Sequence, residues 1–75
     1  TVLGRAGEVD VPLDDAGVSR RHAEIHVTDG RYRVVDLGST NGTFVDGERV
    51  TTGELRDGST ITVGRSRLVF RLGQR

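Results

Sequence analysis

Three Asp-Gly pairs divide the chain into short segments and constrain its fold more than any other feature. The pairs are Asp29-Gly30, Asp46-Gly47 and Asp57-Gly58, and residues typical of strands flank each of them. Asp-Gly between such segments is among the strongest short-range indications of a tight turn, because both residue types tolerate a positive φ. Turns at this spacing leave room for strands of only a few residues.

The segments between the turns show the alternation expected of strands. Ala23, Ile25 and Val27 alternate with polar residues, and segment 68–72 has the same period of two. Further strands are expected at 1–3, 31–37, 43–45, 48–50 and 61–63. No window has the 3.6-residue apolar period of a helix. The pattern predicts an all-β fold, either a β-sandwich or a small barrel.

Composition limits what such a fold could do. The 75 residues, 33% of them hydrophobic, suffice for a single small domain over 1–75, without a large substrate cavity. The absence of cysteine excludes disulfides, thiolate catalysis and cysteine-ligated zinc, and a cytoplasmic location is expected. No apolar segment approaches the length needed to span a bilayer, so membrane insertion is not expected.

The charges are balanced in an unusual way. All 11 basic residues are arginine, the 11 acidic residues cancel them, and the formal net charge is zero. Proteins that bind nucleic acids generally carry a clear basic excess, so nucleic acid is not expected as a partner. An anionic ligand would have to be held by a local cluster of arginines. Arginine without lysine also suggests a bacterial source with a GC-rich genome.

Both ends of the sequence lie close to predicted strands. One strand is expected directly at Thr1–Leu3, and the last ends a few residues before the C-terminus. Little sequence is then left to cover the open edges of the sheets. One or two N-terminal strands are therefore expected to be missing from this chain.

Three loops contain the residues best suited to binding. They are Gly4-Arg5, Ser19-Arg20-Arg21-His22 and Gly38-Ser39-Thr40-Asn41-Gly42-Thr43. Loops on a rigid β scaffold commonly carry the functional residues of a domain. Guanidinium groups, hydroxyls, an amide and glycine-rich backbone together suit a phosphate dianion, whose oxygens accept charge-assisted hydrogen bonds.

In this order and at this spacing, the three loops resemble those of the forkhead-associated (FHA) domain family. The similarity rests on Gly4-Arg5, Ser19-x-x-His22 and the run from Gly38 to Thr43, and it extends from Leu3 to Leu72. FHA domains are two-sheet antiparallel β-sandwiches of short strands that bind phosphothreonine in extended peptides. The resemblance implies the same fold and the same ligand for this chain, with no cofactor and no metal.

The resemblance also implies roles for individual residues. Arg5 and Ser19 correspond to the main phosphate ligands, and Thr40 corresponds to a further contact. Asn41 corresponds to the residue that binds the peptide backbone, and Arg20 could reach the phosphate as well. The residues that correspond to structural supports of the loops are Gly4, His22 and Gly42.

The implied function is non-catalytic recognition of a protein that a Ser/Thr kinase has phosphorylated on threonine, by a monomer or weak dimer. Gly17 and Val18, just before the phosphate-binding serine, supply no charge that would select an acidic peptide residue. Two other classes stay open on the sequence alone. The chain could be a structural sandwich that assembles through its sheet edges, or Arg5, Arg20 and Arg21 could contact nucleic acid.

Catalytic and metal-binding interpretations have less support. Ser19, His22 and Asp36 invite comparison with a hydrolase triad, but the sequence has no Gly-x-Ser-x-Gly elbow. On a strand, His22 and His26 would lie about 13 Å apart, too far to share one metal ion. Without lysine, the chain has no Walker-type phosphate loop. The sequence therefore predicts neither a catalytic residue nor a metal ligand.

Overall fold

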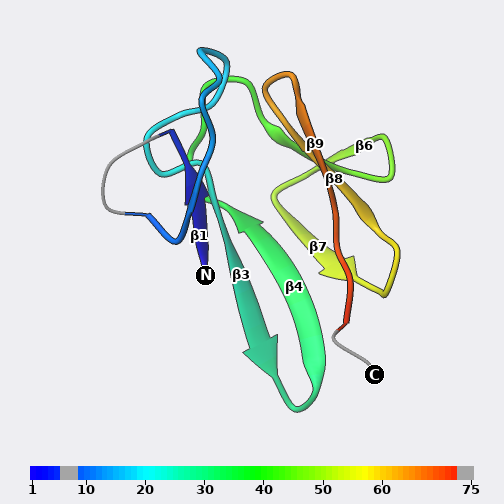
Figure 1. Ribbon diagram of the computed structural model, residues 1–75. Helices are drawn as coiled ribbons and strands as arrows, with labels where there is room; N and C mark the ends of the chain where they lie inside the picture. Colours follow the sequence, from blue (N-terminus) through cyan, green and yellow to red (C-terminus); the bar gives the residue numbers. More distant parts are fainter. Residues whose placement is uncertain (6–8, 73–75) are drawn as a thin grey trace.

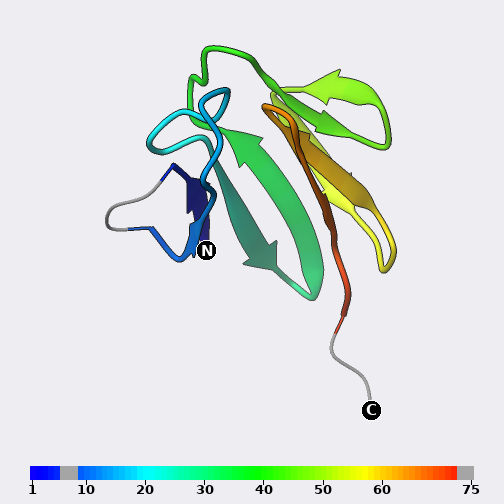
Figure 2. The same ribbon diagram turned by 45° about the horizontal axis from the view of Figure 1, so that its top comes forward.

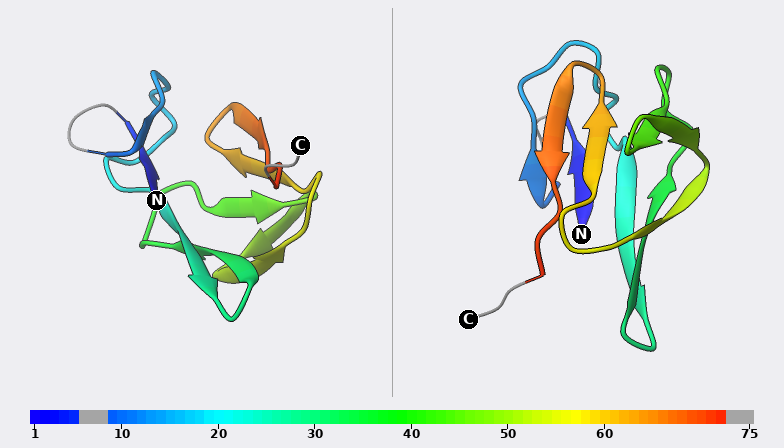
Figure 3. Two further views of the ribbon diagram at one scale, coloured as in Figure 1. Left: turned by 60° about the horizontal axis from the view of Figure 1, so that its bottom comes forward. Right: turned by 90° about the vertical axis from the view of Figure 1, so that its right-hand side faces the viewer.

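Two sheets of short strands make up the computed structural model, which describes residues 1–5 and 9–72. The strands are β1 (Val2–Gly4), β2 (Val11–Pro12), β3 (Ala23–Thr28), β4 (Arg31–Asp36), β5 (Thr43–Val45), β6 (Glu48–Val50), β7 (Thr52–Leu55), β8 (Thr60–Val63) and β9 (Ser66–Val69). One sheet has the order β2-β1-β3-β4-β7 and the other β6-β5-β8-β9 (Figure 1). Figure 3 shows the β8–β9 hairpin, in orange, opposite the sheet that contains β3 and β4. The predicted all-β, two-sheet fold is confirmed.

The sequence does not predict β2, and this strand departs from the expected antiparallel pattern. It pairs with β1 in parallel, with Leu3 opposite Val11 and Gly4 opposite Pro12. Proline has no N–H to donate and is tolerated at the edge of a sheet, which is where β2 lies. The other strand pairs of the described residues are antiparallel. The expected antiparallel sandwich therefore includes one parallel pair, β1 with β2, at the edge of the first sheet.

β7, at the opposite edge of the same sheet, lies just before the third Asp-Gly pair but lacks the apolar alternation that predicts the other strands. A Cβ on Gly53 would lie 3.2 Å from methyl groups of both Val45 and Val50. Glycine therefore allows β7 to pass close to the second sheet. The same glycine interrupts the apolar alternation by which a strand is identified in a sequence.

The predicted tight turns are present at the Asp-Gly pairs. Asp29 and Gly30 connect β3 to β4 with φ values of 53° and 73°, and Asp46 and Gly47 connect β5 to β6 with 49° and 86°. Positive φ at both central residues is the type I′ geometry that matches the twist of antiparallel strands. Gly58 also has a positive φ, 90°, but its turn carries the chain from one sheet to the other.

Small aliphatic side chains fill the space between the sheets. Alternate residues of β8 are buried, and the rings of Tyr32 and Phe70 pack with their centroids 5.3 Å apart. The buried apolar residues are Val2, Leu3, Val18, Ala23, Val34, Val45, Leu55, Ile61 and Val63. This core fixes the two sheets relative to each other, so the loops at their ends start from rigid positions.

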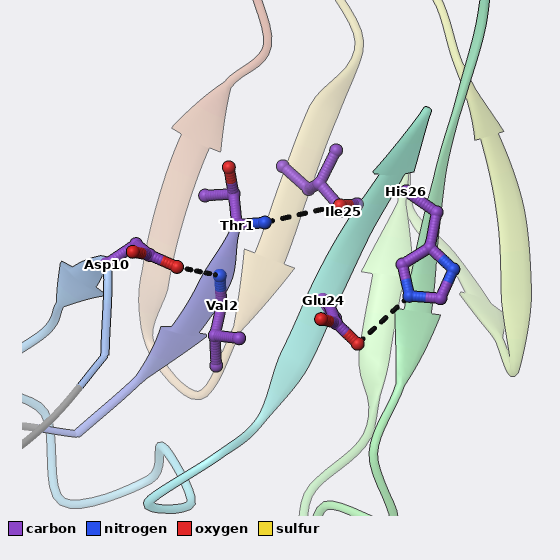
Figure 4. A network of polar contacts seen from close by, with 6 residues as sticks. All are labelled: Thr1, Val2, Asp10, Glu24, Ile25 and His26. Atoms are coloured by element: carbon purple, nitrogen blue, oxygen red, sulfur yellow. Dashed lines mark hydrogen bonds and ion pairs between the residues drawn. The ribbon is translucent and has the colours of Figure 1, made fainter. Parts of the chain in front are cut away.

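Polar contacts hold β1 against its neighbours (Figure 4). The N–H of Val2 donates to the Asp10 carboxylate at 2.9 Å, and the terminal amino group donates to the carbonyl of Ile25 at 3.4 Å. On β3, Nε2 of His26 lies 2.9 Å from the Glu24 carboxylate, and this hydrogen bond lowers the pKa of Glu24. His26 thus faces a partly exposed carboxylate of the same strand.

Strand pairing places the predicted binding loops at one end of the sandwich. Leu3 and Asp36 both lie opposite Ala23, and Thr43 lies opposite Val63 in the second sheet. The segments that leave these strand ends are 4–5, 19–22, 37–42 and 64–65. Figure 2 brings this end forward, with the β3–β4 turn at the opposite end. The fold therefore gathers loops that are far apart in the sequence.

Candidate functional site

Ser19 lies between the other two predicted loops and is bonded to both. Its carbonyl accepts a hydrogen bond from the N–H of Arg5 at 3.0 Å. Its hydroxyl oxygen accepts one from the N–H of Thr40 at 3.1 Å. The structure thus brings together three residues that the sequence places in three separate loops. The side chains of Arg5 and Thr40 are exposed, and that of Ser19 is half-buried.

His22 is fully buried beneath this junction and links two of the loops. Its Nδ1 accepts the N–H of Ser19 at 3.0 Å, and its Nε2 lies 2.7 Å from the carbonyl oxygen of Gly42. The first contact requires an unprotonated Nδ1 and the second a protonated Nε2, which defines a single neutral tautomer. With both nitrogens bonded to backbone groups, His22 has the geometry of a loop support and does not form a triad with Asp36.

Gly4 permits the close approach of β1 to the second loop. A Cβ at this position would lie 1.9 Å from the carbonyl oxygen of Arg20 and 2.8 Å from its carbonyl carbon. No side chain can occupy that space while the backbone stays in place. The backbone of Arg20 therefore lies against β1, while its side chain is exposed at the same end of the sandwich as Arg5.

The loop between β4 and β5 is organised around the carboxylate of Asp36. One oxygen accepts the N–H groups of Gly38 and Ser39, both at 3.0 Å. The other accepts the hydroxyls of Ser39 at 2.5 Å and Thr43 at 2.7 Å. The hydroxyl of Ser39 in turn accepts the N–H of Gly42 at 2.9 Å. Gly42 has a φ of 88°, which favours glycine at this turn.

This loop makes folding sensitive to acid. Partial burial raises the pKa of Asp36, but hydrogen bonds from Ser39, Thr43 and Gly38 outweigh it and hold the pKa below its ordinary value of 3.8. A depressed carboxyl pKa stabilises the fold above the unfolded-state pKa, and this stabilisation is lost as pH falls through the folded-state value.

We therefore expect Asp36→Asn to reduce the loss of stability between about pH 5 and about pH 3. The measurement is the free energy of unfolding in urea across this range for the wild-type chain and the variant. Asp14→Asn, which changes an exposed carboxyl, is the control and should keep the wild-type acid dependence. An Asp36→Asn variant that loses stability in acid as steeply as the wild-type chain would contradict the assignment.

Asn41 is exposed beside an open groove. Its side-chain nitrogen donates to the carbonyl of Gly17 at 2.8 Å, so part of the amide is used within the protein. The groove has a volume of about 530 Å³ and is lined by Asp15, Ala16, Gly17, Asn41, Gly64 and Arg65. Asn41 thus lies at the exposed surface where the resemblance predicts a contact with peptide backbone.

Asp15 joins this groove to the β8–β9 turn. Its carboxylate accepts the N–H groups of Gly17 and Arg65, each at 2.8 Å, and the hydroxyl of Ser66 at 2.8 Å. The hydrogen bond from Ser66, together with those from the two N–H groups, lowers the pKa of Asp15. Residues that are 50 positions apart thereby form one surface.

Sequence reasoning missed the parts played by Asp15, Asp36 and Ser39. Asp36 followed by Gly38 and Ser39 has the spacing of an Asx turn, which could have identified the loop anchor. Nothing in the sequence pairs Asp15 with Arg65, because that contact depends on how the two sheets pack.

The exposed groups at this end suit a phosphate. Arg5 and Arg20 supply exposed guanidinium donors, and Ser19 and Thr40, two residues with hydroxyls, meet where the backbone of Thr40 bonds to Ser19. Such donors bind a dianion through short, charge-assisted hydrogen bonds. In the part of the chain that the structure describes, no group of three or more His, Asp or Glu side chains could hold a metal ion. No helix long and apolar enough to cross a membrane occurs among the same residues.

The sequence is similar to a known domain family and to proteins of two bacteria. The FHA domain family matches residues 1–64. The chain is 48% identical over 73 residues to the oxoglutarate dehydrogenase inhibitor of Corynebacterium efficiens, and 47% identical over 73 residues to the glycogen accumulation regulator GarA of Mycolicibacterium smegmatis. Each alignment covers 97% of this chain but 51% and 46% of those proteins, so the chain spans about half the length of these relatives. Both are bacterial, in agreement with the arginine-only composition.

Solved FHA domains share the fold. One, analysed for phosphothreonine-dependent FHA domain interactions, has a TM-score of 0.91 and 38% identity. The match covers 99% of the present chain and 77% of the solved chain. EmbR of Mycobacterium tuberculosis, solved in complex with a low affinity phosphopeptide, has a TM-score of 0.90 and 37% identity. This match covers 100% of the present chain and 21% of the EmbR chain. With the sequence match, the shared sandwich and three loops that meet at Ser19, the chain belongs to the FHA domain family.

Proposed function

We propose that this chain is a non-catalytic module that binds phosphothreonine in an extended segment of a partner protein. The observation that carries the proposal is the pair of hydrogen bonds that join the loops of Arg5 and Thr40 to Ser19. These bonds hold the backbones of Arg5 and Thr40 against Ser19, so that a guanidinium and two hydroxyls start from neighbouring positions at one exposed end of a rigid sandwich. A phosphate group needs such a preorganised set of donors to be held by a small domain without a deep pocket.

Each residue has a defined part in the proposal. Arg5 and Ser19 bind the phosphate, Thr40 and Arg20 add contacts to it, and Asn41 binds the peptide backbone beside it. Support comes from the exposed guanidinium of Arg5 and from the exposed position of Asn41. The loop supports in the proposal are Gly4, His22 and Gly42, whose contacts hold the loops to one another or to a strand, apart from the hydrogen bond between Ser19 and His22 within one loop.

The hydrogen bonds of the buried His22 favour a binding role over a catalytic one. Both nitrogens of His22 are engaged with backbone groups, so it is not available as a general base for Ser19. The two relatives described above are an inhibitor and a regulator by name. The proposal implies a Ser/Thr kinase that phosphorylates the partner, and it places the module in the cytoplasm with that kinase.

A titration of fluorescently labelled peptides, followed by anisotropy, tests the proposal. The probes are one peptide pool with phosphothreonine at its centre, the same pool with phosphoserine, and the same pool with unmodified threonine. Charge-assisted hydrogen bonds contribute about 1.5–3 kcal/mol each, and three or four of them, less the ordering of the peptide, correspond to a micromolar Kd.

We expect micromolar binding of the phosphothreonine pool, weaker binding of the phosphoserine pool and none of the unmodified pool. Circular dichroism on the same samples shows whether the chain is folded. Equal binding of the three pools by folded protein would refute the proposal, as would no binding of any of them. Added salt should weaken the phosphothreonine complex, because the contacts are ionic.

A further inference from the structure

Arg49 reaches the phosphate-binding end of the molecule from a different hairpin. It lies on β6, opposite Phe44, and its side chain extends back to Gly42. A Cβ on Gly42 would lie 2.7 Å from Nε, 3.0 Å from Cζ and 3.2 Å from one terminal nitrogen of the guanidinium. The guanidinium therefore occupies the space that a side chain at position 42 would fill. It lies next to the residue that follows Asn41.

The charge of Arg49 is not neutralised within the described residues. Its side chain is exposed, and the ion pair found among those residues joins His26 to Glu24 on another strand. Asp36, the acidic group of the neighbouring loop, has both oxygens occupied by hydroxyl and backbone donors of that loop. An exposed guanidinium thus lies against Gly42, the residue that follows the proposed peptide-binding residue Asn41 in the chain.

We propose that Arg49 selects an anionic side chain of the bound peptide, close to the phosphothreonine. The proposal rests on the proposed function, since it assigns a second contact of the same ligand. An arginine presents a planar fork of N–H donors that matches a carboxylate or a phosphate. Gly17 and Val18, just before Ser19, carry no charge. In this proposal the positive charge that selects an acidic peptide residue is therefore on β6.

An aspartate scan measures this selection. The probe is a short alanine-based peptide with a central phosphothreonine, into which one aspartate is placed at each flanking position in turn. For the wild-type chain we expect aspartate at one position, or at two adjacent positions, to tighten binding about threefold to fivefold over alanine. Arg49→Gln should bring this ratio close to one, and Arg49→Lys should restore part of it.

Arg56→Gln is the matched control. It removes the same charge from an exposed arginine in the turn between β7 and β8. This turn precedes Thr60, whereas Thr43 lies opposite Val63 at the other end of β8, so Arg56 is distant from the site. This variant should keep the wild-type ratio. A third arm replaces the favoured aspartate with phosphoserine, and a larger gain that Arg49→Gln abolishes would identify a second phosphate as the better anion.

The ratio separates selection from a structural role. If Arg49 only packs on Gly42, Arg49→Gln will weaken the alanine and aspartate peptides equally, and the unchanged ratio will overturn the proposal. An aspartate scan without any preference in the wild-type chain would overturn it too, while binding of the all-alanine phosphopeptide leaves the proposed function standing. If folded wild-type protein does not bind that alanine-flanked phosphopeptide, both proposals fail.

Discussion

Arg5→Ala is expected to abolish phosphothreonine-peptide binding and to leave the fold intact. The side chain is exposed, and its one contact to Ser19 in the described residues is made by the backbone N–H, which alanine retains. Loss of a bidentate, charge-assisted contact to phosphate removes about 3 kcal/mol, which is a decrease in affinity of about a hundredfold. Anisotropy titration gives the affinity, and thermal unfolding of the same sample reports the fold.

Two further variants complete this experiment. Arg5→Lys keeps the charge without the planar fork, so an intermediate affinity is expected. Arg71→Ala removes another exposed arginine, near Gly58 and away from the site, and should bind as the wild-type chain does. The assignment of Arg5 is wrong if Arg5→Ala unfolds the chain, or if it binds the phosphopeptide with undiminished affinity.

Gly4→Ala should destabilise the chain more than alanine at any other described glycine. The new Cβ would meet the carbonyl oxygen of Arg20 at 1.9 Å, and this is backbone that cannot turn away as a flexible side chain can. β1 and the loop before β3 would have to separate. We expect a decrease of at least about 3 kcal/mol in the free energy of unfolding. That is most of the stability available to a domain of this size.

Gly47→Ala is the appropriate comparison. Gly47 has a φ of 86° and nothing within 4 Å of its Cβ position, so alanine there adds backbone strain without a clash. Its expected effect is about 1 kcal/mol. Urea unfolding of both variants gives the two values, and a two-dimensional NMR spectrum shows whether Gly4→Ala is folded at all. Equal stabilities of the two variants would show that β1 can move away at little cost.

Much of the sandwich could be predicted because its determinants are local. The alternation of Ala23, Ile25 and Val27 predicts β3, and the positive φ values of Asp29 and Gly30 follow from the residue types themselves. Strands β2 and β7 could not be predicted in this way. β2 has two residues, and the glycine in β7 is explained only by the valines of the opposing sheet.

The candidate site could likewise be predicted only in part. The resemblance to FHA domains predicts Arg5, Ser19, Thr40 and Asn41 as binding residues from their order in the chain. It did not show that Ser19 holds the backbones of the two other loops, because that depends on the position of β1 relative to β4.

The fold class, the tight turns and the chemical character of the loops follow from the amino-acid sequence. Periodicity and backbone preference act over a few residues, so neighbours in the chain are enough to predict them. The contacts of Arg20 with Gly4, of Asp15 with Arg65 and of Arg49 with Gly42 depend on the folded chain. Those contacts join residues from different strands and sheets, and their distances are set by how the two sheets pack around the common core.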